Sequence, residues 1–117
     1  MTIRLIGQVK SGKNHLMITA SGHRYPLKAW ADWRDYAVMA AKHQAQGRRF
    51  EVPVVATFYL WCQDKRRRDI PGLEDAIYHV LERSGILKDD SLVVEQHTFK
   101  VYAPDKPGAS IELKEVA

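Results

Sequence analysis

The feature that most constrains the fold is a run of β-branched and aromatic residues at positions 52–62, which passes directly into a cluster of charged residues. Val, Thr, Phe, Tyr and Trp are the residue types that strands favour. The run therefore predicts a largely buried β-strand whose chain reaches the surface in the charged segment at 63–68. Pro53 has no backbone N–H to donate, so we expect it at the very start of this strand.

Further strands are predicted near both ends of the chain. Residues 3–9 mostly alternate between apolar and polar side chains, which is typical of a half-buried strand. Residues 91–102 and 110–116 are rich in strand-forming side chains. Between residues 16 and 25 we expect a short hairpin, preceded by a basic loop at 10–14.

Two segments have helical periodicity. The first covers residues 27–46 and ends at Gly47, where a left-handed backbone costs little. Its apolar positions are Trp30, Trp33, Ala37, Ala40 and Ala41. The second covers residues 71–84, with a proline in its first turn and Gly85 just past its end. We therefore expect an α+β fold in a single domain at 1–117, with two main helices packed on one face of a small mixed sheet.

Bulk properties limit the class of protein only loosely. The formal net charge of +4 and the pI of about 9.3 suit a polyanionic partner, but solubility alone would explain them equally well. The single cysteine, Cys62, allows no intramolecular disulfide and fits a reducing compartment. No segment is long and apolar enough to span a bilayer. We therefore expect a cytoplasmic protein without a membrane partner.

The charged segment holds four consecutive cations, Lys65, Arg66, Arg67 and Arg68, between the buried strand and the second helix. Such a run is often no more than a solvated connection. Here, however, Asp69 follows at once, and a carboxylate beside a patch that attracts polyanions is costly unless a metal cation lies between them. The segment is therefore a candidate for binding both phosphate and metal.

A second acidic pair, Asp89 and Asp90, stands after Gly85 and before a predicted strand. Asp is common in turns, so a solvated connection explains the pair equally well. The spacing along the chain does not say whether this pair lies near Asp69.

Taken together, these segments resemble the core of the RusA-type endodeoxyribonucleases, a family of Holliday-junction resolvases. The resemblance rests on the segments 64–70, 80–86 and 89–94, and it extends to the Ser-Gly-Lys-Asn run at 11–14, to Lys100 and to residues 108–113. It therefore covers nearly the whole chain, and the central segments are its specific part.

The resemblance implies a RusA-like fold and an enzyme that resolves four-way DNA junctions in recombination and repair by paired phosphodiester hydrolysis. It implies a homodimer, because an isologous two-fold dimer presents one site to each of two strands in a roughly two-fold junction. It also implies Mg²⁺ as the cofactor, with Mn²⁺ as a substitute, held by aspartates. Such a protein would be bacterial or phage-encoded.

Residue by residue, the resemblance matches Asp69 to the first aspartate of the family motif and Asp90 to the catalytic aspartate of a later pair. Asp89 would then assist at the metal. The chain departs from the motif in between, where Pro71 stands in place of a second aspartate and Asp75 in place of an active-site lysine. Position 72, an asparagine in the motif, is glycine here.

Two interpretations of this departure are open. Asp75 lies four residues beyond Pro71, on the same face of the helix, and its carboxylate could replace the lost one. Alternatively, Asp75 and His79 form a charge-swapped pair at the same spacing, and the site is short of ligands. We favour the first, and expect Asp69, Asp75 and Asp90 to be catalytic, with Asp69, Asp75, Asp89 and Asp90 holding the metal.

The expected nucleic-acid contacts are polar or basic residues that bind the DNA backbone rather than read its sequence. They are Lys10, Lys13, Asn14, Arg24, Lys65, Arg66, Arg67, Arg68 and Lys100. Asp69 could also cap the second helix, and Trp30 and Trp33 suit the core or a dimer contact better than base stacking. Two other functions are open: a junction-binding module that has lost catalysis, and an interaction domain with no nucleic-acid role.

Overall fold

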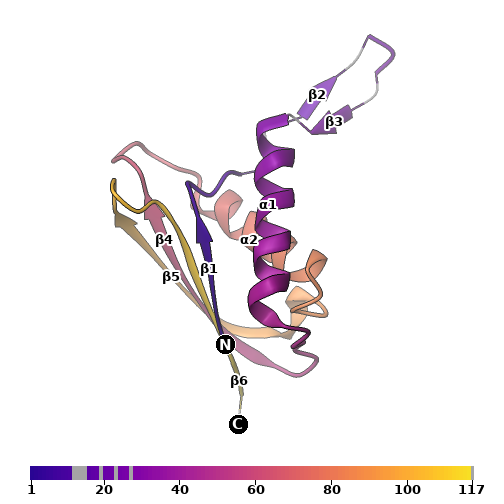
Figure 1. The fold of residues 1–117 in the computed structure, drawn as a ribbon, viewed down its shortest axis with the longest axis vertical. Helices are drawn as coiled ribbons and strands as arrows, with labels where there is room; N and C mark the ends of the chain where they lie inside the picture. Colours follow the sequence, from indigo (N-terminus) through magenta and orange to yellow (C-terminus); the bar gives the residue numbers. More distant parts are fainter. Residues whose placement is uncertain (12–15, 19, 23, 27, 117) are drawn as a thin grey trace.

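Strand β4 (Val54–Cys62) lies inside a four-stranded mixed sheet with the strand order β1-β6-β4-β5 (Figure 1). The computed structural model describes residues 1–11, 16–18, 20–22, 24–26 and 28–116. The other strands are β1 (Thr2–Ile6), β5 (Val93–Tyr102) and β6 (Gly108–Glu115). Strand β4 runs antiparallel to β6 and parallel to β5, and β6 runs antiparallel to β1. The expected mixed sheet is confirmed.

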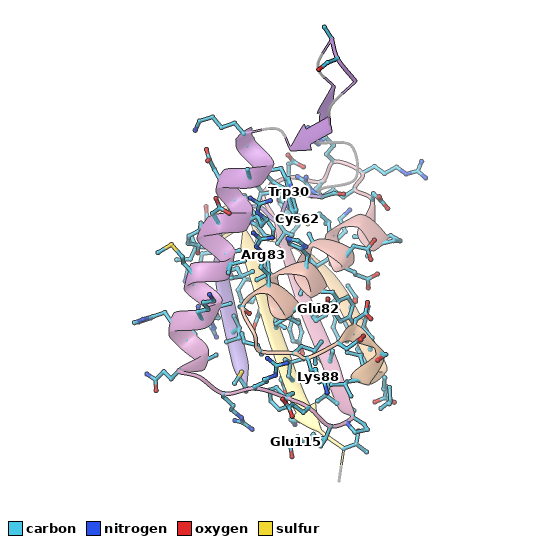
Figure 2. The ribbon with its side chains drawn as sticks, turned by 90° about the vertical axis from the view of Figure 1, so that its right-hand side faces the viewer. Trp30, Cys62, Glu82, Arg83, Lys88 and Glu115 are labelled. Atoms are coloured by element: carbon cyan, nitrogen blue, oxygen red, sulfur yellow. The ribbon has the colours of Figure 1, made fainter. Side chains whose placement is uncertain are left out.

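The parallel pairing of β4 and β5 requires a crossover, which α2 (Ile70–Arg83) supplies. The chain leaves β4 at Cys62, returns along the helix, and enters β5 at Val93, which pairs with Val54. The fourteen helical residues span about 21 Å. Residues 64–69 therefore lie at one end of the sheet and residues 89–92 at the other, as Cys62 and Lys88 illustrate in Figure 2.

Helices α1 (Lys28–Ala45) and α2 pack side by side on one face of the sheet (Figure 2). From α1, the buried side chains are Trp30, Trp33, Ala37, Ala41 and Ala45. From α2, the buried residues are Gly72, Leu73, Ala76, Ile77, Val80 and Leu81. The rings of Trp30 and Trp33 stack with centroids 5.5 Å apart inside this core. The expected α+β fold and the core position of both tryptophans are confirmed.

Only one face of the sheet is covered, and this corrects the expectation of a largely buried central strand. Along β4 the fully buried residues alternate with partly exposed ones, of which Tyr59 is the most exposed. The physical reason is that both helices lie on the same side, so every second side chain of β4 faces away from them. The strand also begins at Val54, after Pro53 rather than at it.

Other boundaries shift by a few residues. Strand β1 ends at Ile6 because Gly7 takes a positive φ of 90° and turns the chain. A short 3-10 helix, Asp90–Leu92, occupies the first positions expected for β5. The expected hairpin forms from β2 (Leu16–Ile18) and β3 (Arg24–Pro26), a separate two-stranded sheet beyond the first turn of α1 (Figure 1). Among the described residues, neither helix has the length and apolarity to cross a lipid bilayer.

Candidate active site

A cleft of about 320 Å³ opens where β4 ends and α2 begins. It brings Lys10 and Ser11, which follow β1, together with the basic loop and Asp69. Its lining residues are Gln8, Val9, Lys10, Ser11, Gln63, Arg66, Arg67, Arg68, Asp69 and Leu73. Segments more than fifty residues apart in sequence thus form one cationic recess with a carboxylate in its wall. We call it the basic cleft.

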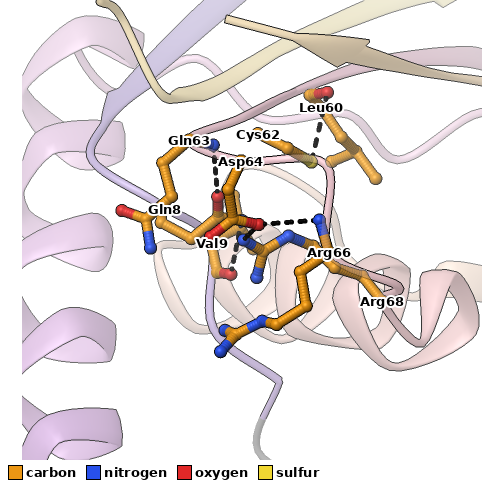
Figure 3. A network of polar contacts seen from close by, with 8 residues as sticks. All are labelled: Gln8, Val9, Leu60, Cys62, Gln63, Asp64, Arg66 and Arg68. Atoms are coloured by element: carbon orange, nitrogen blue, oxygen red, sulfur yellow. Dashed lines mark hydrogen bonds and ion pairs between the residues drawn. The ribbon is translucent and has the colours of Figure 1, made fainter. Parts of the chain in front are cut away.

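Side-chain hydrogen bonds hold the basic cleft in shape (Figure 3). The Oε1 atom of Gln8 accepts a hydrogen bond of 2.9 Å from the backbone N–H of Gln63, which ties the segment after β1 to the start of the loop. The Asp64 carboxylate accepts from the backbone N–H of Arg66 at 3.0 Å and from Nη2 of Arg68 at 2.8 Å. The hydrogen bond from the Arg66 N–H, together with the positive charges of Arg68 and Arg66, lowers the pKa of Asp64.

The four cations of the loop are not equivalent. Only 9% of the Arg68 side chain is exposed, and its guanidinium is paired with Asp64. Within the described residues, its buried Nε atom has no hydrogen-bond partner. Arg66 and Arg67 are exposed, and Lys65 places its Nζ 5.1 Å from the centroid of the Tyr102 ring. Arg68 therefore shapes the loop, whereas the other three cations face solvent.

Asp69 occupies the N-cap position of α2, but its side chain makes no capping hydrogen bond. Its carboxylate instead lies over Gly72, beside the hydroxyl of Ser11. A Cβ atom at position 72 would stand 2.6 Å from Oδ2 of Asp69 and 2.5 Å from Oγ of Ser11, closer than real Cβ contacts come. The glycine is therefore what allows the carboxylate and the hydroxyl to approach the helix together.

Of the three positions that depart from the expected motif, Gly72 is buried, and Pro71 and Asp75 lie on the exposed surface of α2. Pro71 stands in the first turn and Asp75 one turn further along. His79 turns toward α1, where its ring centroid lies 6.0 Å from that of Trp30. Burial lowers the pKa of His79, and the positive charges of Arg83 and Arg34 act in the same direction. His79 thus faces the interface between the helices.

The second acidic pair belongs to a cluster at the other end of α2. Ligand-type oxygens of Glu82, Asp89 and Asp90 all lie within 4.8 Å of one another, and all three residues are exposed. The backbone N–H of Asp90 donates to Oε1 of Glu82 at 3.0 Å, and Oδ1 of Asp89 accepts from the N–H of Ser91 at 2.9 Å. The hydrogen bonds from Ser91 lower the pKa of Asp89. We call these residues the acidic cluster.

Sequence reasoning missed Glu82 as a member of this cluster. The signal was present in Gly85, which adopts a positive φ of 81° and reverses the chain at the end of α2. The N–H of Gly85 then bonds to the carbonyl of Glu82 at 3.0 Å, and the following residues fold back over the last helical turn. This reversal brings Asp89 and Asp90 to Glu82.

The expected catalytic residues are therefore distributed over both ends of α2. Asp69 stands at the first end and Asp90 at the second, and Asp75 lies on the helix between them. In the part of the chain that the structure describes, no group of three or more metal-ligand side chains includes Asp69 or Asp75. One chain by itself does not place Asp69, Asp75 and Asp90 around one point.

A hydrogen-bonded network lines the side of α2 that faces β5. The hydroxyl of Tyr78 donates to Gln96, and the amide of Gln96 donates to Glu74 and, at 3.0 Å, to Thr98. Burial, followed by the negative charges of Glu74 and Asp90, raises the pKa of Tyr78 to about 12. The network fixes the helix over β5 and keeps the acidic cluster beside the start of that strand.

The remaining expected DNA contacts are dispersed. Lys100 is exposed on β5, opposite Leu60 and thus near the end of the sheet that carries the basic cleft. Arg24 is the first residue of β3. Lys13 and Asn14 lie outside the described residues.

Comparison with known proteins identifies the class to which this fold and site belong. The family model described as "Endodeoxyribonuclease RusA" matches residues 7–114, nearly the whole chain. A similar curated protein is the crossover junction endodeoxyribonuclease RusA of Aquifex aeolicus (strain VF5), which is 26% identical over 83 residues. That match covers 71% of this chain and 66% of the relative, so the chain spans just under two thirds of the relative's length. The chain belongs to the RusA endodeoxyribonuclease family.

Proposed function

We propose that the protein is a metal-dependent, structure-selective DNA endonuclease that resolves four-way junctions by paired hydrolysis. The observation that carries the proposal is the basic cleft, in which Lys10, Arg66 and Arg67 surround Asp69 in a member of this nuclease family. A phosphodiester backbone is the ligand that such a recess suits, because cations neutralise phosphate and a metal ion would offset the repulsion between a bound phosphate and the Asp69 carboxylate. The corresponding role is junction resolution in recombination and repair, in the cytoplasm of a bacterium or phage-infected cell.

The acidic cluster fits a hard divalent cation. Its three carboxylates converge within 4.8 Å and are exposed, so solvent can complete an oxygen coordination shell. We propose Mg²⁺, with Mn²⁺ as a substitute, held by Asp89, Asp90 and Glu82 of one copy of the chain together with Asp69 of a second copy. The ion would supply Lewis-acid activation of the attacking water and neutralisation of charge on the leaving oxygen.

The residues of the chain itself bind and orient the substrate. Lys10, Lys65, Arg66 and Arg67 would hold phosphates on either side of the scissile bond, and Lys100 would extend this contact along β5. Arg68 would act through Asp64, by fixing the loop that presents its neighbours. Because these contacts are to phosphates, they confer affinity without sequence preference.

The separation of Asp69 and Asp90 supports a homodimer in which each site is shared. Strand β5 is the outer strand of the sheet and pairs with β4 alone among the strands that the structure describes. If two copies pair antiparallel along this edge, the start of β5 in one copy lies beside the end of β5 in the other. The acidic cluster of one copy would then face Asp69 and the basic cleft of its partner. We propose that Asp90 and Asp69 of opposite copies complete one site.

The direct test is cleavage of a synthetic four-way junction in Mg²⁺, with Glu82→Gln as the informative variant. We expect the parent protein to release nicked duplexes, and Glu82→Gln to raise the Mg²⁺ concentration for half-maximal activity about tenfold or more, because one ligand is lost. Glu115→Gln, an exposed acid at the end of β6, is the matched control and should behave as the parent. An intact junction at all concentrations of Mg²⁺ and Mn²⁺ would refute the proposal.

A second candidate function is a junction-binding module without catalysis. The observation that favours it is the loss of a motif aspartate at Pro71, while Asp75 belongs to no ligand group among the described residues. This function is supported if the parent protein binds four-way junctions without nicking them, and if the Asp69→Asn and Asp90→Asn variants bind the junctions as tightly as the parent does.

A further inference from the structure

The face of the sheet that the helices leave uncovered carries a patch of apolar and aromatic side chains. Its members come from three strands: Ile6 of β1, Tyr59 and Trp61 of β4, and Phe99 and Val101 of β5. The exposed fraction is 79% for Ile6 and 48% for Phe99. The rings of Tyr59 and Phe99, directly opposite in register, stack with centroids 5.2 Å apart. We call these five residues the open-face patch.

The patch is hollowed beside Trp61. Strand β6 passes between Ile6 and Trp61 and contributes only Gly108 at that level. No larger residue can stand there, because a Cβ would meet the carbonyl oxygen of Leu5 at 2.2 Å. A mainly apolar cavity of about 590 Å³ lies at this end of the sheet, and its lining includes Arg4, Ile6, Trp61, Asp105, Lys106 and Pro107. Cavities of this size accommodate small planar ligands.

Charge distinguishes this end of the open face from the other. Further along the sheet the charged side chains have neighbours on the surface: Lys114 pairs with Glu112 at 3.4 Å, and Nε2 of His97 lies 3.3 Å from the carboxylate of Glu95. At the cavity, Arg4 instead lies 5.9 Å from the centroid of the Trp61 ring. Arg4 and Lys106 form no ion pair with any residue in the described ranges. The indole of Trp61 is therefore flanked by two cations and one carboxylate, that of Asp105, so the positive charges are in excess at the cavity.

We propose that this cavity binds an unpaired nucleobase of single-stranded DNA, stacked on the indole of Trp61, with Arg4 and Lys106 at the adjacent phosphates. Aromatic side chains beside cations form the general arrangement by which proteins hold single strands, since every base has a stacking face. The site lies at the same end of the sheet as the basic cleft, because Trp61 stands one residue before the end of β4 and the basic loop follows that strand. The inference rests on the proposed DNA substrate and adds a second contact beyond the cleaved phosphate.

The test is the affinity for a fluorescein-labelled ten-residue oligothymidylate, measured by fluorescence anisotropy at low salt. Trp61→Ala should weaken this affinity at least about fivefold, the loss typical of one stacked base. Arg4→Gln should weaken it too and reduce its salt dependence by about one phosphate contact. Met39→Ala removes an exposed apolar side chain from α1, outside the open-face patch, and should leave the affinity unchanged.

A spectroscopic readout separates stacking from a loss of folding. Trp30 and Trp33 are buried, so quenching of tryptophan fluorescence by added oligothymidylate should arise at Trp61. Trp61→Phe keeps an aromatic face and should retain most of the affinity while losing the quenching. Quenching that persists undiminished in Trp61→Phe would contradict the assignment.

The possible outcomes distinguish a failure of this inference from a failure of the proposed function. If Trp61→Ala binds oligothymidylate as the parent does while the parent cleaves junctions, the inference fails and the proposed function stands. If the parent binds neither oligothymidylate nor junctions, both fail. If Trp61→Ala converts a dimer into a monomer in light scattering, the patch is an interface between copies, and the nucleobase site is refuted.

Discussion

Gly72 is the residue on which the approach of Asp69 and Ser11 depends. Its missing side chain leaves room for a carboxylate and a hydroxyl above the first turn of α2, where any Cβ would collide with both. In an ordinary helix interior glycine costs about 1 kcal/mol relative to alanine. Glycine at position 72 therefore lowers the stability of the helix but leaves room for the Asp69 carboxylate.

Gly72→Ala is therefore expected to impair function more than stability. The new methyl group displaces the Asp69 carboxylate and should lower the rate of junction cleavage tenfold or more, while the gain in helix propensity offsets the local crowding. Cleavage at saturating Mg²⁺ and thermal unfolding measure the two effects. The double variant Ser11→Ala, Gly72→Ala relieves one of the two collisions and should recover part of the rate. Full activity in Gly72→Ala would show that the position of Asp69 is unimportant.

Asp64 makes a pH-dependent contribution to the basic loop. Because hydrogen bonds and nearby cations lower its pKa in the folded state, its contribution is fully present above the unfolded value of about 4 and is lost as the pH falls through the folded pKa. The melting temperature of Asp64→Asn should therefore lie below that of the parent at pH 7, and the two should converge below pH 4. A gap that is constant down to pH 2 would exclude this linkage.

At the scale of elements, the sequence predicts which segments form strands and helices but not how many faces of the sheet are covered. The run at 52–62 has strand-forming residues on both faces, and Tyr59 and Trp61 read as core residues for that reason. The structure places both helices on one face, which leaves these aromatics on the other. Similarly, nothing in the spacing of Asp69 and Asp90 reveals that a crossover helix separates them. Long-range placement of this kind depends on strand order, which local patterns do not encode.

Because only one face of the sheet is covered by helices, neighbouring residues of β4 contribute differently to the free energy of unfolding. Phe58 is fully buried, and its ring meets that of Tyr78 edge-on with centroids 5.2 Å apart. Phe58→Ala should lower the free energy of unfolding by about 3–5 kcal/mol. Thr57→Ala, on the open face of the same strand, should change it by less than about 1 kcal/mol. Urea unfolding checks both, and equal losses would show that the two faces are packed alike.

At the scale of the whole molecule, α2 divides the surface into a basic end and an acidic end. Lys10, Arg66 and Arg67 gather where the helix begins, and Glu82, Asp89 and Asp90 where it ends. A nuclease needs both kinds of group at one phosphate, the cations to hold it and the carboxylates to hold a metal. In the proposed homodimer, two copies related by a two-fold axis would satisfy this need and would also match the symmetry of a four-way junction.

The central claim is a shared metal-dependent site, and a mixed dimer tests it most directly. Asp69→Asn and Asp90→Asn chains carrying different affinity tags are co-expressed, and the mixed dimer is purified through both tags. With shared sites, one site of the mixed dimer has both substitutions and the other has neither. The mixed dimer should therefore nick one strand of a four-way junction in Mg²⁺, although each variant alone is inactive.

The reciprocal control pairs the parent chain with an Asp69→Asn, Asp90→Asn double variant. Shared sites leave both sites of this dimer broken, so it should be inactive, whereas sites confined to one chain would leave one intact. Nicking by the mixed dimer and not by the control is the expected result. Nicking by the control and not by the mixed dimer would contradict the shared site, and an intact junction with the parent homodimer would contradict the nuclease itself.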